Sequence, residues 1–376
     1  MPDSKKNSES NQAKMHNRRS AFRVLDANAN RATEGLRVVE EFLRFHWQDR
    51  FLTETCKSIR HEVSRTVVRL MSVEERTACR STETDVGVQV QGEAEYSRPG
   101  LVDVALANVK RATEALRVME EYSKLLASDT SKDAAKHFES LRYRTYTLEK
   151  SIGHLVRGSQ RLQHAWLYVL IDGSFGFGDE FRNRVAELAR SKVDVVQLRA
   201  KEATDREIVD VAREVGGILK SAGITFIIND RPDIARVVNA DGVHVGQSEL
   251  SVADARAIVG PEMLIGVSTH CLSQAKQAVV DGADYIGVGP VFPSETKQFQ
   301  QFAGLEFVKE VAGEIRLPSF AIGGVDETRL PELLAAGGSR VAISHAIWHA
   351  SELGASAERI KAELLRANPS LFNVEL

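Results

Sequence analysis

The sequence predicts an α/β protein in which a (β/α)8 TIM barrel is preceded by an all-α domain built from a duplicated helical hairpin. Three observations lead to this prediction. The chain has helical periodicity up to about residue 155. A helical segment near residue 30 recurs near residue 110. From Trp166 onward, eight short apolar strands alternate with helical segments over about two hundred residues.

Composition and charge are those of an ordinary globular protein. The chain has 376 residues, of which 43% are hydrophobic and 27% charged, which is enough for two or three domains. The formal net charge of -3 and a pI of about 6.4 give no sign of binding to nucleic acid or to an anionic membrane. No stretch is long and apolar enough to form a membrane helix.

The cysteines and the N-terminus bear on the compartment. The three cysteines, Cys56, Cys79 and Cys271, are few and far apart, so we expect no disulfide framework and no Cys-based zinc site. Such usage fits a reducing cytoplasm. Residues 1–20 are polar and basic with no apolar core, which is unlike a signal peptide or an anchor, and we predict a disordered tail there. The predicted helical domain spans 21–155 and the barrel domain 156–376.

The helical domain repeats itself. The first predicted helix, Ala27–Phe45, is followed by a second at Phe51–Met71 and then by a polar connection. In the first helix the apolar residues fall at helical spacing: Ala32, Leu36, Val39 and Leu43. The segment Asn30–Phe42 returns as Lys110–Tyr122, and a helix at Lys132–Leu155 follows the second copy. This duplication predicts a bundle with pseudo-twofold symmetry.

Polar residues are repeated in the two copies as well. Arg31, Thr33, Glu34, Arg37, Glu40 and Glu41 match Arg111, Thr113, Glu114, Arg117, Glu120 and Glu121. Residues three or four apart on a helix lie near one face, so these could form a salt-bridged, solvated surface. The functional interpretation is a polar pocket where the copies meet, with Arg37 and Arg117 available to bind phosphate.

The repeated pattern Asn-x-x-Arg-Ala-x-Glu-x-Leu-Arg, with Asp85-Val-Gly87, resembles the small helical hydroxymethylpyrimidine-phosphate kinase domain that is often fused ahead of a thiamine phosphate synthase. The resemblance covers about 21–155 and implies that this domain uses ATP. No Gly-x-x-x-x-Gly-Lys-Ser/Thr loop occurs in this half. An oligomerisation or docking module is the alternative, because helical hairpins often bury apolar faces against partners. The sequence is compatible with a homo-oligomer and does not fix an oligomeric state.

Eight strands are predicted in the second half. They are Trp166–Ile171, Val193–Leu198, Thr225–Ile228, Gly242–Val245, Leu264–Val267, Tyr285–Val288, Ser319–Ile322 and Arg340–Ile343. Predicted helices lie between and after them: Glu180–Ser191, Asp205–Ala222, Val252–Val259, Ser273–Asp281, Gly304–Val311, Glu327–Ala336 and Ser351–Ala367. An open doubly wound sheet is the alternative to a closed barrel.

Polar residues gather just after the strands, where active sites of this fold lie. They are Gln197, Arg199 and Lys201 after the second strand, Asn229 and Asp230 after the third, Gln247 and Glu249 after the fourth, Ser268 and His270 after the fifth, Ser294, Thr296 and Lys297 after the sixth, Gly323 and Gly324 after the seventh, and Ser344 and His345 after the eighth.

The residue types indicate the kind of ligand. Cations beside the carboxylates of Asp230 and Glu249 suit a Mg²⁺–diphosphate group, because hard oxygen ligands bind Mg²⁺ and the cations bind phosphate. An ion-pair network that closes the barrel is the alternative. The glycine pair after the seventh strand and Ile343-Ser344 after the eighth match the phosphate site that this fold often builds. We therefore expect one diphosphate site with a metal and one monophosphate site.

The barrel segments are strongly similar to thiamine phosphate synthase. The matching pieces are Gln197–Lys201, Asn229-Asp230, Asp241–Gln247, Gly266–His270, Gly282–Pro290, Pro293–Lys297 and Gly323-Gly324. The resemblance covers about 165–350. It implies that a pyrimidine methyl diphosphate is joined to a thiazole phosphate carboxylate with release of diphosphate.

The resemblance also implies residue roles. Gln197, Arg199, Lys201, Asn229, Ser268 and Lys297 would hold the pyrimidine diphosphate, with Arg199, Lys201, Ser268 and Lys297 as the catalytic set. Ser294, Thr296, Gly324, Ile343 and Ser344 would hold the thiazole phosphate. Asp230 and Glu249 would bind Mg²⁺. Glu249 is a departure, since the family usually has Asp there, and Ser294/Thr296 varies the usual Thr-x-Thr.

A thiazole tautomerase of the same barrel type is a further alternative. It would keep the thiazole phosphate site and a histidine after the fifth strand, here His270. It has no use for the diphosphate and metal groups. The presence of Arg199, Lys201, Asp230 and Lys297 therefore favours the synthase.

Overall fold

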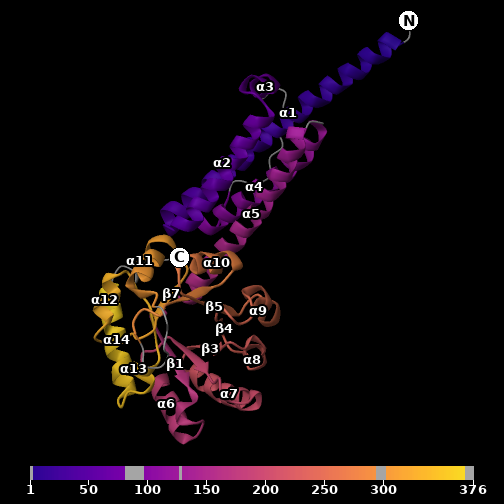
Figure 1. The fold of residues 1–376 in the computed structure, drawn as a ribbon. Coiled ribbons are helices and arrows are strands. Elements are labelled where there is room, and N and C mark those ends of the chain that lie inside the picture. The colour runs from indigo at the N-terminus through magenta and orange to yellow at the C-terminus, as the bar shows by residue number, and fades with distance from the viewer. Residues whose placement is uncertain (1–2, 81–96, 127–128, 294–301, 369–376) are drawn as a thin grey trace. The chain divides into compact units, whose positions relative to one another are not determined.

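The computed structural model describes residues 3–80, 97–126, 129–293 and 302–368. The chain forms two compact units, Met1–Lys150 and Ser151–Leu376, shown in Figure 1. We predicted the boundary at residue 155. No separate linker occurs at either position, because helix α5 (Asp129–Arg161) contributes residues to both units. No helix among the described residues combines the length and apolarity that a membrane crossing needs.

The first unit is helical throughout its described part. Its elements are α1 (Asp3–Glu41), η1 (Phe42–Trp47), α2 (Arg50–Leu70), α3 (Val73–Cys79), α4 (Leu101–Ser123), η4 (Lys124–Leu126) and the first part of α5. Local signals start two of these helices. The Asp49 carboxylate accepts the N–H of Leu52 at 2.8 Å and begins α2. Ser72 and Glu75 form a reciprocal capping box that begins α3, a helix we had not predicted.

The predicted disordered tail over 1–20 differs from the structure, in which α1 already begins at Asp3. The segment contains Lys, Glu, Gln and Ala and no proline or glycine after Pro2, so nothing in it terminates a helix that is anchored further on. Residues 15–20 are exposed, and the buried face of α1 starts at Ala21. Arg18 contacts Glu75 and Arg19 contacts the carbonyl oxygen of Ala78, so residues 15–20 are held at the surface of α3 and bury no apolar face.

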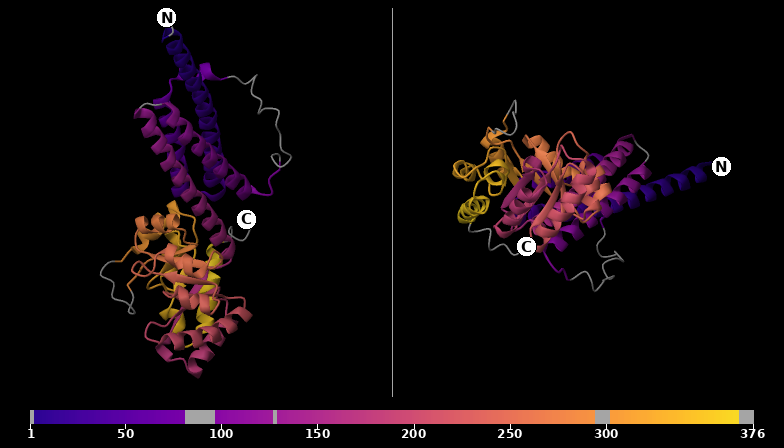
Figure 2. Two further views of the ribbon diagram at one scale, coloured as in Figure 1. Left: turned by 90° about the vertical axis from the view of Figure 1, so that its right-hand side faces the viewer. Right: turned by 90° about the horizontal axis from the view of Figure 1, so that it is seen from below.

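The two helical copies pack through small residues. Helices α1, α2 and α4 lie side by side (Figure 2). At the contact of α1 with α4, a Cβ atom on Gly35 would lie 2.9 Å from the carbonyl oxygen of Asn108, so this approach needs glycine. Leu36 and Leu116, which correspond in the two copies, are fully buried. The duplicated hairpin is thus visible in the core of the unit.

The second unit is a closed parallel barrel. Its strands run in the order β1 to β8, and β8 pairs with β1, which rules out the open sheet. They are β1 (Leu167–Asp172), β2 (Val195–Arg199), β3 (Thr225–Asn229), β4 (Gly242–Val245), β5 (Leu264–Thr269), β6 (Tyr285–Val288), β7 (Ser319–Ile322) and β8 (Val341–Ile343). All eight predicted strands are confirmed, with ends that shift by at most two residues.

Helices surround the strands (Figure 1). They are the short η5 (Gly173–Phe175), α6 (Asp179–Arg190), α7 (Asp205–Ser221), α8 (Pro232–Val237), α9 (Val252–Val259), α10 (Leu272–Asp281), α11 (Gly304–Glu314), α12 (Leu330–Ala335), α13 (His345–Trp348) and α14 (Leu353–Ala367). We had not predicted α8 and α13, which are too short to show helical periodicity. The barrel interior is filled by a cluster that includes Tyr168, Ile227, Tyr285 and Phe320.

The amino-terminal ends of the strands carry a repeated hydrogen-bond pattern. The carboxylates of Asp194, Asp241 and Asp284 each accept a backbone N–H from the strand before their own, from Leu167, Phe226 and Ile265 respectively. Before β8 the corresponding residue is Arg340, which donates to the carbonyl oxygens of Ala165 and Leu162. This end of the barrel is therefore held by charged side chains that bind backbone, and the opposite end is left for a site.

Candidate active site

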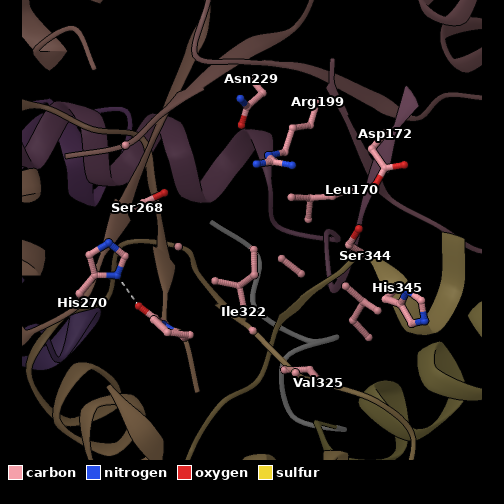
Figure 3. A pocket seen from close by; sticks show the side chains of 18 of the residues that line it. Leu170, Asp172, Arg199, Asn229, Ser268, His270, Ile322, Val325, Ser344 and His345 are labelled. Atoms are coloured by element: carbon pink, nitrogen blue, oxygen red, sulfur yellow. Dashed lines mark hydrogen bonds between the residues drawn. The ribbon is translucent and has the colours of Figure 1, made fainter. Parts of the chain in front are cut away.

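A cavity of about 680 Å³ lies at the carboxyl ends of the strands. Figure 3 shows side chains from β1, β2, β3, β5, β7 and the segment after β8 around it. It collects most of the predicted rim: Arg199, Lys201, Asn229, Asp230, Gln247, Glu249, Ser268, His270, Gly323, Gly324, Ile343, Ser344 and His345. The convergence of these residues from the ends of different strands on one space is what the strand-end argument predicted.

Cations and carboxylates share one side of the cavity. The ammonium of Lys201 lies 2.8 Å from a carboxylate oxygen of Asp230. Asp230 adopts a left-handed conformation with φ of 62°, and its N–H donates to the carbonyl oxygen of His244 at 2.8 Å. That conformation is uncommon outside glycine and is frequent at functional sites. Apart from its backbone pairing in β2, Arg199 has no partner among the described residues, so its guanidinium is available to an anion.

Glu249 is the second predicted metal ligand. Its carboxylate folds back over Gly246, where a Cβ atom would overlap with it, and it accepts a hydrogen bond from the Ser248 hydroxyl at 3.3 Å. Asp230 and Glu249 line the same cavity, and within the described ranges no cluster of three or more His, Cys, Asp or Glu side chains is placed to hold a metal ion. Two carboxylates suit Mg²⁺, which commonly takes one or two protein carboxylates and completes its shell with water and substrate phosphate.

The opposite side is shaped by two glycines. Gly323 and Gly324 have φ values of 97° and 63°, which favour glycine. A Cβ atom on Gly323 would lie 2.7 Å from Cβ of Pro290, so the turn has no room for a side chain. Ser344 follows β8, and its carbonyl oxygen accepts the N–H of Trp348 at 2.8 Å. The backbone of the turn and the Ser344 hydroxyl suit a phosphate group.

Arg329 belongs to this side and was missed by the sequence analysis. Its Nη1 atom donates to the carbonyl oxygens of Pro293 at 3.0 Å and Gly324 at 2.7 Å. These bonds continue a backbone ladder in which Val291 N–H donates to Ile322 and Phe292 N–H donates to Gly323. Arg329 lies several residues beyond the end of β7, outside the positions that strand ends single out, although an arginine near a glycine pair was a usable signal.

Two further predicted residues contact backbone. Gln247 donates from its amide nitrogen to the carbonyl oxygen of Ser268 at 2.7 Å, and His270 Nδ1 lies 2.5 Å from the carbonyl oxygen of Gly289. The dashed line in Figure 3 marks the His270 contact. Gln247 therefore holds the loop after β4 to the end of β5, and His270 joins the segments that follow β5 and β6.

Gln197 lies elsewhere than expected. It does not line the main cavity; it is buried and lines a smaller adjoining cavity of about 110 Å³ that extends into the barrel interior. Its amide donates to Asn229 Oδ1 at 2.8 Å and accepts from the Tyr168 hydroxyl at 3.0 Å. Depth along the strand explains the difference: Gln197 points to the same face of β2 as Arg199 but lies two residues earlier, further from the strand end.

Three predicted residues, Ser294, Thr296 and Lys297, lie outside the described residues, as does Asp85-Val-Gly87 of the helical unit. Their predicted roles stay predictions.

The repeated polar residues of the helical unit form two matching ion-pair clusters. Buried Glu40 accepts from Arg37 and from Arg60 on α2, the latter at 2.8 Å. Buried Glu120 accepts from Arg117 at 2.6 Å and from Arg142 on α5 at 3.1 Å. Burial acts to raise the pKa of Glu120, but the two arginines hold that pKa below its usual value. This pairing favours the structural interpretation of the repeat, because each arginine already has a carboxylate partner.

Comparison with known proteins agrees with the geometry. The family model described as "Thiamine monophosphate synthase" matches residues 167–347, and the ThiD2 family model matches residues 23–151. A thiamine-phosphate synthase of Gloeobacter violaceus is 42% identical over 334 residues, which cover 89% of this chain and 94% of the relative. One of Rhodopirellula baltica is 41% identical and covers 88% of each chain.

Among solved structures, thiamine phosphate pyrophosphorylase from Pyrococcus furiosus superimposes with a TM-score of 0.50 and 27% identity. The match covers 56% of this chain and 99% of that one. The curated relatives, in contrast, extend over both units. From its barrel, from the strand-end cavity and from relatives at about 40% identity along nearly its whole length, the chain belongs to the thiamine-phosphate synthase family.

Proposed function

We propose that the barrel joins 4-amino-2-methyl-5-(diphosphomethyl)pyrimidine to thiazole phosphate carboxylate. The bond between the methylene carbon and the diphosphate oxygen breaks, and the thiazole nitrogen forms a new bond to that carbon. Diphosphate leaves. Because thiamine phosphate has no carboxylate, the bond from the thiazole ring carbon to the carboxylate also breaks, CO₂ leaves, and that ring carbon takes a proton. The observation that carries this proposal is the single cavity, which has Arg199 and the Lys201–Asp230 pair on one side and the Gly323-Gly324 turn on the other.

The proposed reaction needs few chemical groups from the protein. An electron-rich aminopyrimidine stabilises positive charge on its methylene carbon once diphosphate departs. Catalysis then depends on stabilising the leaving group and on positioning the thiazole nitrogen. We assign the first task to Arg199, Lys201 and Lys297, and the holding of the pyrimidine to Asn229 and Ser268. This assignment needs no protein nucleophile.

The thiazole phosphate is assigned to the opposite side of the cavity. Gly324, Ile343 and Ser344 would contact its phosphate together with Ser294 and Thr296. Arg329 does not need to touch the phosphate in this scheme, because it fixes the turn that does.

We propose Mg²⁺ as the metal, held by Asp230 and Glu249. It would supply positive charge to the diphosphate. Lys201, which is paired with Asp230, would stay beside the same group and add its own charge. Glu249 is one methylene longer than the Asp usual in the family, and its carboxylate reaches back over Gly246 rather than outward.

We further propose that the helical unit phosphorylates hydroxymethylpyrimidine phosphate with ATP. Its match to the ThiD2 family supports this proposal, and the product would be the substrate of the barrel. We place both steps in a reducing, cytoplasmic setting, which is compatible with the free thiols of Cys56, Cys79 and Cys271.

A reconstitution with the full chain tests these proposals. The chain is incubated with Mg²⁺, the pyrimidine monophosphate and thiazole phosphate carboxylate, with and without ATP. We expect thiamine phosphate only when ATP is present. If it forms only when the diphosphate is supplied ready-made, the kinase proposal is wrong and the synthase stands.

Lys201→Ala provides the matched control. It should accumulate the pyrimidine diphosphate from ATP while forming little thiamine phosphate. Loss of both steps in this variant would contradict the division of labour between the units. No thiamine phosphate from any combination with the wild type would overturn the synthase assignment.

A further inference from the structure

Six polar side chains form a continuous hydrogen-bonded chain inside the barrel, which we call the interior chain. In order they are Asn229, Gln197, Tyr168, Tyr285, His244 and Ser268, and they come from six different strands. The contacts measure 2.8, 3.0, 3.2, 3.2 and 3.0 Å. The two end residues line both the main cavity and the smaller one beneath it. The middle of the chain therefore links two groups of the site through the core.

The donor and the acceptor of every hydrogen bond in the interior chain follow from one of these bonds. The Tyr168 hydroxyl donates to Gln197 Oε1, so its single proton is used there. At 3.2 Å from Tyr168, the Tyr285 hydroxyl must then donate to the Tyr168 oxygen. Since the proton of Tyr285 is also used, His244 Nδ1 must carry the proton that bonds to the Tyr285 oxygen. Each step is fixed because a phenol has one proton to give.

The tautomer of His244 decides whether the Ser268 hydroxyl donates or accepts. The imidazole contacts the hydroxyls of Tyr285 and Ser268 and has no carboxylate among the described residues bonded to its ring, so a neutral ring is the expected form of this half-buried histidine. A neutral ring protonated on Nδ1 accepts at Nε2, so the Ser268 hydroxyl donates to it at 3.0 Å. Ser268 Oγ is left with lone pairs only.

The two ends of the interior chain thus present different groups to the small cavity: a hydrogen-bond donor at Asn229 and an acceptor at Ser268. Asn229 accepts from Gln197 at Oδ1, so its Nδ2 hydrogens are the groups it can offer, and no described residue takes them. Ser268 offers an acceptor for the reason above. An aminopyrimidine edge presents an amino donor beside a ring-nitrogen acceptor. Its 4-oxo analogue presents an N–H donor beside a carbonyl acceptor, with the two positions exchanged.

We propose that Tyr168, Tyr285 and His244 are positioning residues that fix a donor at Asn229 and an acceptor at Ser268, and thereby select a 4-aminopyrimidine over its 4-oxo counterpart. This inference rests on the proposed function for the identity of the substrate. It goes beyond that function in assigning selectivity to residues that need not touch the substrate. A buried site whose polar groups are matched to one pattern strongly rejects the reversed one, because the wrong ligand leaves them unpaired.

The test measures binding of two probes to the full chain by calorimetry without thiazole phosphate. The probes are 4-amino-2-methyl-5-(diphosphomethyl)pyrimidine and its 4-oxo analogue, and the readout is the ratio of their Kd values. Binding that belongs to the barrel is identified by its loss in Lys201→Ala. The wild type should prefer the amino compound by at least about 100-fold.

Tyr285→Phe removes the oxygen that holds the proton on His244 Nδ1. The proton can then move to Nε2, and Ser268 becomes free to donate outward. We expect the preference to fall below about tenfold, mainly because the oxo analogue binds more tightly than it does to the wild type. A gain in affinity for one probe distinguishes repositioned protons from general damage to the core.

Two more variants complete the design. Tyr168→Phe removes the hydroxyl that joins Gln197 to Tyr285 and should also reduce the preference for the amino probe. It serves as the test if Tyr285→Phe does not fold. Phe320→Leu is the control, because Phe320 lines the same small cavity but has no polar group. Its ring centroid lies 5.2 Å from that of Tyr168 and 5.8 Å from that of Tyr285. It should keep the wild-type ratio.

An unchanged ratio in both tyrosine variants would overturn the inference. If the wild type also forms thiamine phosphate in that case, only the inference fails. If the wild type prefers the amino probe and loses that preference in Tyr285→Phe but forms no thiamine phosphate, the proposed function fails and the interior chain stands.

Discussion

Gly158 packs directly against the carbonyl oxygen of Asp284, at a place where a Cβ atom would overlap with that oxygen. Around this contact the Asp284 carboxylate accepts from Arg157 and Arg256 and contacts His154 at 3.0 Å. The last turns of α5 are therefore fixed to the start of β6, at the barrel end opposite the cavity.

Gly158→Ala should lower the free energy of unfolding by about 1–3 kcal/mol, because the new methyl group meets backbone that cannot move aside. Urea unfolding of the full chain measures the change. Gly153→Ala is the control in the same helix: Gly153 is exposed, and nothing among the described residues lies within 4 Å of the place that a Cβ atom would take. That variant should gain about 0.5–1 kcal/mol. Equal effects in the two variants would contradict the packing argument.

Asp284 should make the stability depend on pH. Burial acts to raise its pKa, but the contacts with His154, Arg157 and Arg256 hold the pKa below its usual value. A carboxyl with a depressed pKa in the folded state stabilises the fold above about pH 4, and this contribution is lost as the pH falls through the folded-state pKa. Asp284→Asn should cost about 3–5 kcal/mol at pH 7 and less at about pH 3.5. Unfolding at both pH values measures this, and a difference that grows on acidification would refute it.

Lys201→Ala should reduce kcat/KM for the pyrimidine diphosphate by about 10- to 150-fold, because it removes a charge-assisted contact of roughly 1.5–3 kcal/mol. Lys297→Ala should act in the same direction. Steady-state kinetics on the ready-made diphosphate give both values. Lys220→Ala changes an exposed lysine on α7 and should keep the wild-type rate. Wild-type rates in both Lys201→Ala and Lys297→Ala would remove the diphosphate assignment.

Asp230→Asn and Glu249→Gln should each raise the Mg²⁺ concentration needed for half-maximal rate by at least about tenfold, because each loses a charged oxygen ligand. Glu249→Asp keeps the charge and should stay within about threefold of the wild type. Rate measurements over a Mg²⁺ titration, after treatment with a chelator, separate these outcomes. An unaltered Mg²⁺ requirement in Asp230→Asn would show that this carboxylate is not a ligand.

Arg329→Gln should raise KM for the thiazole phosphate by about tenfold while leaving KM for the pyrimidine diphosphate close to the wild-type value. The reason is that Arg329 bonds to the carbonyl oxygens of Pro293 and Gly324 and so fixes the phosphate turn. Arg329→Lys keeps the charge without the fork of donors, so it should recover only part of the affinity. A parallel rise in both KM values would point to general loosening of the barrel.

The sequence predicted the barrel well because its strands are short apolar runs separated by clear helices, and a closed parallel barrel leaves few other arrangements. It predicted the main cavity because polar residues at strand ends must converge there. Gln197 lines the smaller cavity and not the main one because it lies two residues deeper in β2 than Arg199, on the same face of the strand.

Other features could not be predicted for physical reasons. The interior chain joins side chains that are up to 117 residues apart in the case of Tyr168 and Tyr285, and local patterns carry no information on such pairs. Arg329 acts through two backbone carbonyls, which have no sequence signature of their own. The repeated arginines of the helical unit could serve phosphate or carboxylate, and only the positions of Arg60 and Arg142 show that each has a carboxylate at hand.

Helix α5 belongs to both units, and this limits how the two units can be separated by proteolysis or truncation. A protease finds no exposed loop between residues 129 and 161 at which to nick the chain. A barrel expressed from residue 162 would lack His154 and Arg157 and leave Asp284 with fewer cations around a buried charge. The two proposed activities are therefore best dissected by point substitutions in the intact chain, and a truncated barrel that fails to fold would say nothing about its catalysis.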